Sequence, residues 1–283
     1  MSNTAGLMLR RRIANLAFVA FCVAVTATAL VALAAILWVL LARGVGGINL
    51  DVFLRATPAP NSHGGLANAI IGSVMMCTTA MILALVVGVL AGTWLAEYGK
   101  ASRCASIVRF LNDVLLSAPS ILVGLFVYEV MVAPLHGFSA VAGAVALAML
   151  AAPVITRTTE DVLRLQPSVL RESGVALGAP GALVVREVLW RSARGGILTG
   201  GLLAFARISG ETAPLLFTAL NNQFFGLNPL KPMANLPVVI FQFALSPYDD
   251  WRRLAWVGAL LIAATVLAVT VVARIVTREA KST

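Results

Sequence analysis

Residues 195–220 read GGILTGGLLAFARISGETAPLLFTAL, an apolar stretch long enough to cross a lipid bilayer as one helix. Two charged residues, Arg207 and Glu211, lie near the middle of this predicted span. Their four-residue spacing would place both side chains on one face of the helix. A charge at the centre of a bilayer costs roughly 2.5–3.5 kcal/mol, and such residues usually face a protein interior or an aqueous path. We therefore interpret the pair as part of a path for a polar substrate; the alternative is an ion pair that only fixes helix packing.

The composition of the 283-residue chain is that of an integral membrane protein. Hydrophobic residues make up 60% of it and charged residues only 12%, against about 25% charged residues in soluble domains. The net charge of +9 would suggest a nucleic-acid partner for a soluble protein. Here the basic residues lie beside apolar runs, where they set membrane orientation instead. We therefore expect the chain to contact membrane lipid and to bind no nucleic acid.

Six apolar runs have a length suited to a transmembrane helix. They are residues 16–42, 68–96, 107–132, 138–155, 196–220 and 254–276. The sequence therefore predicts an all-α integral membrane protein with six transmembrane helices in a single domain, residues 16–276.

The basic residues also predict the orientation of these spans. If Arg10–Arg12 lie in the cytoplasm and the spans alternate, most of the other Lys and Arg residues fall on the same side. The positive-inside rule then places both chain ends in the cytoplasm. The predicted cytoplasmic segments are 1–15, 156–194 and 277–283, and the predicted external loops are 43–67 and 221–253.

Residues that could support catalysis or metal binding are few and scattered. Cys22, Cys77 and Cys104 lie in or beside different spans, and His63 and His136 lie in separate external segments. We therefore expect no disulfide and no metal site. The sequence also lacks a G-x-x-x-x-G-K-[ST] phosphate-binding loop and a G-x-S-x-G nucleophile elbow. Any nucleotide hydrolysis is expected to belong to another chain, so this chain is not predicted to be an enzyme.

Glycine and proline positions predict details of the helices. The spacings Gly88–Gly92 and Gly196–Gly200 place small residues one turn apart, which favours close helix packing. Pro119 and Pro153 lie inside apolar spans, where each predicts either a break that lines a cavity or a tolerated kink.

The cytoplasmic segment 156–194 is too charged to cross the membrane and contains one predicted short helix, residues 169–177. Pro167 and Ser168 suit its start, and Gly178 suits its end. Arg171 and Glu172 would lie on its exposed side, on a small surface for a soluble partner.

This segment resembles the "EAA" loop of bacterial ATP-binding-cassette (ABC) importer permeases, in which Glu-Ala-Ala is followed, after three residues, by Gly. The run RESGVALGA, residues 171–179, matches that pattern at Glu172 and Gly178, while Ser173 and Gly174 replace the two alanines. In that family the helix of the loop inserts into a groove of the ATPase subunit. The resemblance implies that Arg171, Glu172 and Gly178 take part in ATPase coupling.

Further motifs resemble the PstA family, the permeases of the bacterial high-affinity phosphate importer. They are GGLANAIIGSV (64–74), SAPSILVGLF (117–126), ARISGETAPLLFTALNNQFF (206–225) and NLPVVIFQFA (235–244). The resemblance implies a type I ABC importer permease fold in the bacterial inner membrane. It also implies four partners: a homologous PstC-like permease in a heterodimer, two PstB-like ATPase subunits and an external PstS-like phosphate-binding protein. ATP and Mg would be bound by the ATPase subunits, and this chain would bind no cofactor.

The resemblance gives the two charged residues a chemical role. Phosphate is an anion, and a guanidinium offers planar bidentate donors, so Arg207 suits phosphate binding. Glu211 would pair with Arg207 in an empty path or accept the proton of a protonated phosphate. The expected mechanism is alternating access driven by the ATPases. Two alternatives remain: a permease for another oxyanion, and a proton-coupled secondary transporter in which Glu211 relays the proton.

Overall fold

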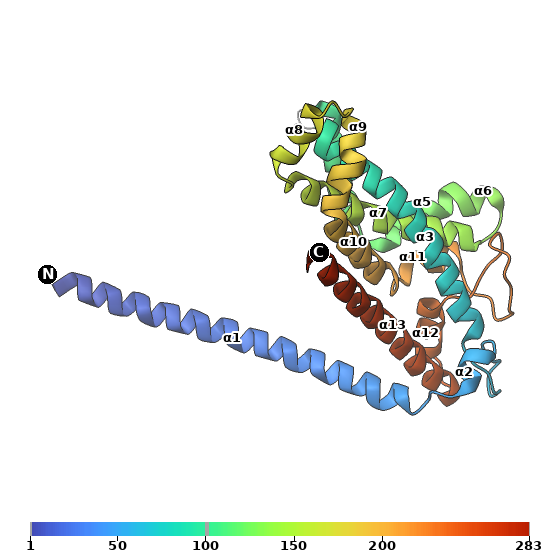
Figure 1. The fold of residues 1–283 in the computed structure, drawn as a ribbon. Helices are drawn as coiled ribbons and strands as arrows, with labels where there is room; N and C mark the ends of the chain where they lie inside the picture. Colours follow the sequence, from blue (N-terminus) through green and yellow to red (C-terminus); the bar gives the residue numbers. More distant parts are fainter. Residues whose placement is uncertain (1, 100–101, 283) are drawn as a thin grey trace.

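The computed structural model describes residues 2–99 and 102–282, and within these residues it is helical with no strand. Figure 1 shows a bundle of tilted helices from which one long helix extends. The helices are α1 (Ser2–Val45), α2 (Leu50–Leu54), α3 (Ala67–Thr93), η1 (Trp94–Tyr98), α4 (Arg103–Ser117), α5 (Ser120–Val127), η2 (Tyr128–Val132), α6 (Ala133–Leu135), α7 (Ala140–Arg164), α8 (Ser168–Ala176), α9 (Gly181–Leu183), η3 (Val184–Leu189), α10 (Trp190–Ile208), α11 (Ala213–Thr218), α12 (Leu236–Ala244) and α13 (Asp249–Ser282). The three η segments are single π-helical turns.

Helix α7 is the centre of the bundle, and glycines set its distance from its neighbours. A Cβ added to Gly92 of α3 would lie 2.6 Å from the carbonyl oxygen of Thr156 on α7. A Cβ added to Gly196 of α10 would lie 2.5 Å from the Val162 side chain on α7. Gly88 and Gly200 are equally tight against α7. Both glycine spacings therefore serve close helix packing, as the sequence predicts.

The two prolines in predicted spans, Pro119 and Pro153, have different effects on their helices. Pro119 stands between α4 and α5, which bend by 107° at this break. Pro153 lies inside α7, which continues from Ala140 to Arg164. The carbonyl of Pro153 accepts a hydrogen bond from Asn112 of α4 (3.3 Å), so α4 packs against the middle of α7.

Two of the six predicted spans are not continuous helices. Residues 107–132 are divided by the bend at Pro119, and residues 196–220 are divided after Ile208. In the described residues, four helices are long and apolar enough to cross a membrane, or five if the bent pair α4–α5 counts as one span. The all-α membrane fold is confirmed, whereas the six-helix count is not.

Helix α1 leaves the bundle near α13 and projects away from it (Figure 1). Among the residues of α1 whose burial is described, close packing lies at the C-terminal end, where Gly44 meets Leu260 of α13 and Arg43 stacks over the Trp256 ring at 5.5 Å. Most of the remaining side chains are exposed and apolar, including Trp38 at 73%. Such a surface is stable against lipid or another membrane subunit.

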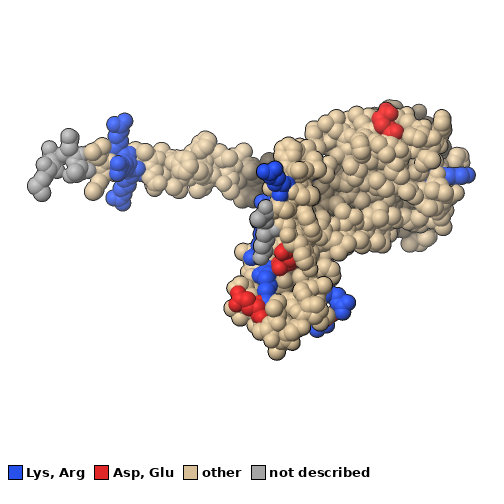
Figure 2. All heavy atoms as spheres, turned by 90° about the horizontal axis from the view of Figure 1, so that it is seen from above, with Lys and Arg blue, Asp and Glu red and all other residues tan. Residues whose placement is uncertain are grey.

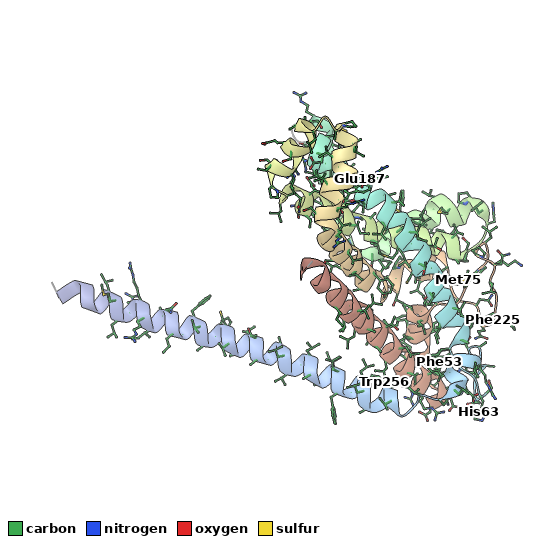
Figure 3. The ribbon with its side chains drawn as sticks, in the orientation of Figure 1. Phe53, His63, Met75, Glu187, Phe225 and Trp256 are labelled. Carbon is green, nitrogen blue, oxygen red and sulfur yellow. The ribbon has the colours of Figure 1, made fainter. Side chains whose placement is uncertain are left out.

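Several ion pairs gather at the end of the molecule that carries α8 and η3. Figure 2 shows most of the body without charged side chains on this face, a basic group on the extended helix, and acidic and basic residues together on the part that projects from the body. In Figure 3, Glu187 marks this end and His63 marks the opposite one, with Met75 of α3 between them. We call the Glu187 end the charged end.

Candidate functional site

Arg207 and Glu211 lie on either side of a helix break. Arg207 is in the last turn of α10, which ends at Ile208, and residues 209–210 form a turn before α11 begins at Ala213. Proline lacks the N–H that would continue the helical hydrogen bonds, so Pro214 fits the start of a new helix rather than the middle of α10. The expected single helical face for the two charges is therefore wrong. Within the described residues, no ion pair or hydrogen bond joins their side chains. Both are partly exposed.

The break is held in place by α11, which packs tightly into the bundle. A Cβ added to Gly124 of α5 would lie 2.6 Å from the Pro214 Cα atom. Gly143 of α7 lies similarly close to Leu215 and Ala219. The carbonyl of Thr218 accepts a hydrogen bond from the Ser139 N–H at 3.0 Å. The end of α10 is thus a fixed feature of the fold, with Arg207 at its tip.

A cavity of about 1050 Å³ lies between α7 and α10 on the charged-end side of this break. Thr158 lies on its α7 wall, and Gly196 and Leu203 lie on its α10 wall. Arg207 follows Leu203 by four residues, and so it continues the same helical face beyond the cavity. We call this space the α7–α10 cavity.

The predicted short helix of segment 156–194 is present as α8, Ser168–Ala176. It ends as predicted: Gly178 adopts a left-handed conformation with φ +76°. The Gly178 N–H donates to the Val175 carbonyl, and the Ala179 N–H donates to the Gly174 carbonyl (2.9 and 3.1 Å). This is the glycine C-cap known as the Schellman motif.

Arg171 is not on the exposed side of α8, contrary to the sequence prediction. Its guanidinium contacts the Glu97 carboxylate of η1, with Nη2–Oε1 at 2.6 Å and Nε–Oε2 at 2.9 Å. It also donates to the carbonyls of Leu163 and Gln166, at 2.7 and 2.8 Å. The hydrogen bond to Glu97 raises the pKa of Arg171 above its ordinary value. Arg171 therefore fixes α8 to the ends of α3 and α7.

Glu172 is exposed, as predicted, and apolar side chains surround it on the outer surface of α8. Val169 and Val175 are each largely exposed, and Leu177 is 88% exposed. On the opposite side, Gly174 is buried, and a Cβ added there would lie 2.6 Å from the Val184 side chain. The helix is thus packed on one face and presents an apolar surface with one carboxylate on the other. We call Val169, Glu172, Val175 and Leu177 the α8 tip.

A second carboxylate, Glu160 of α7, was missed by the sequence analysis. It is 2% exposed, and its Oε1 contacts Arg109 Nε of α4 at 2.8 Å and Arg164 Nη2 at 2.7 Å. Arg109 also donates to the Leu95 carbonyl of η1 at 3.1 Å. The signals available were the i,i+4 spacing to Arg164 and the scarcity of acidic residues in an apolar chain, neither of which identifies Arg109 as a partner.

The segment between α11 and α12, which belongs to the predicted external loop 221–253, is anchored by an asparagine of α3. Asn68 donates to the carbonyls of Asn222 and Gln223, at 3.0 and 3.3 Å. The side chains of Asn222 and Asn228 accept hydrogen bonds from backbone N–H groups two residues later in the chain. These polar residues therefore hold the loop in its own conformation.

Comparison with known proteins agrees with this architecture. A family model described as binding-protein-dependent transport system inner membrane component matches residues 84–282. The chain is 53% identical over 240 residues to the phosphate transport system permease protein PstA of Pasteurella multocida, which covers 85% of this chain and 86% of that protein. It is 34% identical over 277 residues to PstA 1 of Mycobacterium tuberculosis (strain H37Rv), with 95% and 89% covered.

Among solved structures, an inward-facing form of the MetNI methionine ABC transporter matches with a TM-score of 0.63 and 19% identity. The match covers 75% of this chain and 94% of that one. At this identity the likeness concerns the fold, which is that of type I ABC importer permeases. With the family match over most of its length, the chain belongs to the family of binding-protein-dependent transport system inner membrane components.

Proposed function

We propose that the chain is a permease subunit of an ATP-driven importer that carries inorganic phosphate across the bacterial inner membrane. The observation that carries this proposal is the 53% identity to phosphate transport permeases over 85% of the chain. Its family already makes it a multi-pass inner-membrane protein. The choice of phosphate over another oxyanion rests on the similarity to phosphate transport permeases, because a guanidinium group can bind any oxyanion.

In this proposal, Arg207 is the anion-binding residue of the path. Its partial exposure at the end of α10 and the lack of an ion-pair partner within the described residues leave its donors available for phosphate oxygens. A guanidinium binds such oxygens through two parallel hydrogen bonds. Glu211, just beyond the break, accepts the proton of a protonated phosphate. A path shared with a second permease subunit would provide the water that a charge needs at this depth.

The α8 tip is the proposed contact for an ATPase subunit. Its exposed apolar side chains around Glu172 suit a groove on a soluble partner. Gly178 ends the helix so that the tip keeps its shape. Arg171 transmits movement of α8 to α3 through Glu97 and to α7 through the two carbonyls that it binds. The ATPase subunits bind ATP and Mg; this chain binds no cofactor and catalyses no reaction.

The remaining partners follow the same scheme. Two PstB-like ATPases bind at the charged end, which faces the cytoplasm together with both chain ends. A PstC-like permease completes the path, with α1 available to contact it. A PstS-like binding protein delivers phosphate to the external loops 43–67 and 221–253. Closure of the ATPases moves α8 and switches the path from outward-facing to inward-facing.

Phosphate uptake in whole cells tests the proposal. Cells lacking this chain and all other high-affinity phosphate systems are given the native chain or an empty vector, and radiolabelled phosphate is supplied at low concentration. We expect the native chain to restore uptake that is abolished by ATP depletion and resistant to a protonophore. Unchanged uptake would refute phosphate transport, and loss of uptake with the protonophore alone would indicate a secondary transporter.

A further inference from the structure

The α7–α10 cavity has the chemistry of an anion site. Its walls carry two guanidinium groups, Arg191 and Arg194, together with the hydroxyls of Thr158 and Thr199. Asp161 is the acidic residue that lines it. Positive charge and oxygen acceptors in one water-accessible space suit a partly protonated oxyanion, because the guanidinium contacts its charged oxygens and the acceptors receive its proton.

The other charged residues of this cavity already take part in ion pairs. Asp161 contacts Arg157 one turn away on α7, at 3.3 Å. Arg191 contacts Glu187 at 2.7 Å. Among the residues that the structure describes, Arg194 has no carboxylate partner within ion-pair distance. Arg194 is exposed and lines this cavity, and it also lines a neighbouring apolar pocket with Trp190 and Leu198, so Arg194 is the cation available to a ligand.

The cavity is continuous with the face of α10 that carries Arg207. Gly196, Gly200 and Leu203 line the cavity at positions i, i+4 and i+7, and Arg207 follows at i+11. At 1.5 Å per residue, Arg207 lies about 16 Å from Gly196 along the helix axis. An anion that leaves Arg207 toward the charged end would therefore pass through this cavity.

We infer that the α7–α10 cavity is a second oxyanion site, in which Arg194 binds phosphate after it leaves Arg207 and before it is released from the charged end. The inference rests on the proposed transport of phosphate and adds a location and a residue to it. Thr158 and Thr199 donate their hydroxyl protons to carbonyls of their own helices, which leaves their oxygens as acceptors for the P–OH group. Two sites in series allow an ion to move in short steps without tight binding at either one.

Protection of an introduced thiol tests the inference in the complete importer. Thr199→Cys is placed in a chain whose three native cysteines are serine, and inside-out vesicles are treated with N-ethylmaleimide, a neutral reagent. We expect inorganic phosphate to slow modification of the thiol, and chloride at equal ionic strength to have no such effect. Arg194→Gln should raise the phosphate concentration for half protection about tenfold, the loss expected for one charge-assisted hydrogen-bonding group. Leu203→Cys is a second reporter if Thr199→Cys does not assemble.

Arg103→Gln is the matched control, because Arg103 is an exposed arginine of α4 that does not line the cavity; its half-protection concentration should be unchanged. Absence of protection in an importer that still takes up phosphate would overturn the inference and leave the proposed function intact. Equal half-protection concentrations in the Arg194→Gln and native chains would also overturn the inference and leave the proposed function intact. Protection by phosphate in a complex that does not transport it would support the anion site and refute the proposed function.

Discussion

Arg171 of α8 and Glu97 of η1 are joined by a bidentate ion pair, although 74 residues separate them in the chain. The same guanidinium holds two carbonyls at the end of α7. One side chain thus connects the exposed helix α8 to two helices of the membrane bundle. Bidentate charge-assisted hydrogen bonds are short and directional, so in the proposed ATPase coupling this ion pair would carry movement of α8 to the bundle.

Glu97→Gln should uncouple ATP hydrolysis from transport. The amide keeps the size of the side chain but removes the charge, so Arg171 loses its ion pair and α8 can move separately from α3. Hydrogen bonds to charged groups contribute about 1.5–3 kcal/mol, and we expect the phosphate transported per ATP hydrolysed in proteoliposomes to fall about tenfold. Asp51→Asn is the control, because Asp51 forms an exposed ion pair with Arg55 and such pairs contribute little. Equal losses in both variants would contradict the coupling role of Glu97.

Glu160→Gln should destabilise the charged end of the bundle. Glu160 is almost fully buried and bridges Arg109 and Arg164, so the substitution leaves Arg109 without its charge partner in a poorly hydrated place. Breaking a buried pair in this way costs about 3 kcal/mol. We expect a clear decrease in the midpoint of thermal unfolding of the purified complex. Asp51→Asn removes an exposed ion pair with Arg55 and should leave the midpoint nearly unchanged; a similar decrease there would indicate a general charge effect.

Arg207 and Glu211 should not be exchangeable. Because the helix break separates them and no ion pair joins them in the described structure, the double exchange Arg207→Glu with Glu211→Arg should remain as inactive as Arg207→Ala. Arg207→Lys should retain a fraction of the uptake, since an ammonium keeps the charge but cannot form the planar bidentate contact. Phosphate uptake is compared at matched membrane levels in the native chain, Arg207→Ala, Arg207→Lys and the double exchange. Recovery of uptake in the double exchange would show that the two residues act as an ion pair.

The fold class could be predicted from composition and apolar runs, because a bilayer requires long helices whatever the detailed packing. The breaks in two spans were harder to predict. Pro119 interrupts a span and Pro153 does not, although both are prolines in apolar surroundings. The difference depends on the surroundings: Pro153 is buried inside α7, whereas Pro119 is exposed.

The exposed part of the candidate site was also predictable, and its buried part was not. The end of α8 at Gly178 follows from local backbone conformation, which sequence encodes directly. The position of Arg171 depends on Glu97, a residue from a distant helix, and that contact has no local signature. The same holds for Glu160 and Arg109, 51 residues apart.

Gly178→Ala should weaken the C-terminal end of α8 through backbone strain alone. Gly178 has φ +76°, which an L-residue adopts at a cost of roughly 1–2 kcal/mol. No other group lies within 4 Å of an added Cβ at Gly178, so a steric clash makes no contribution. We expect the end of α8 to fray and the ATPase subunits to bind the permease pair several-fold more weakly, as measured by titration in detergent. Gly181→Ala is the matched control, because Gly181 has the same open surroundings and no left-handed backbone. Gly178→Asn should lie between Gly178→Ala and the native chain, since asparagine tolerates this conformation better than alanine. An equal loss at Gly178 and Gly181 would mean that the added methyl group, rather than the helix end, disturbs the contact with the ATPase.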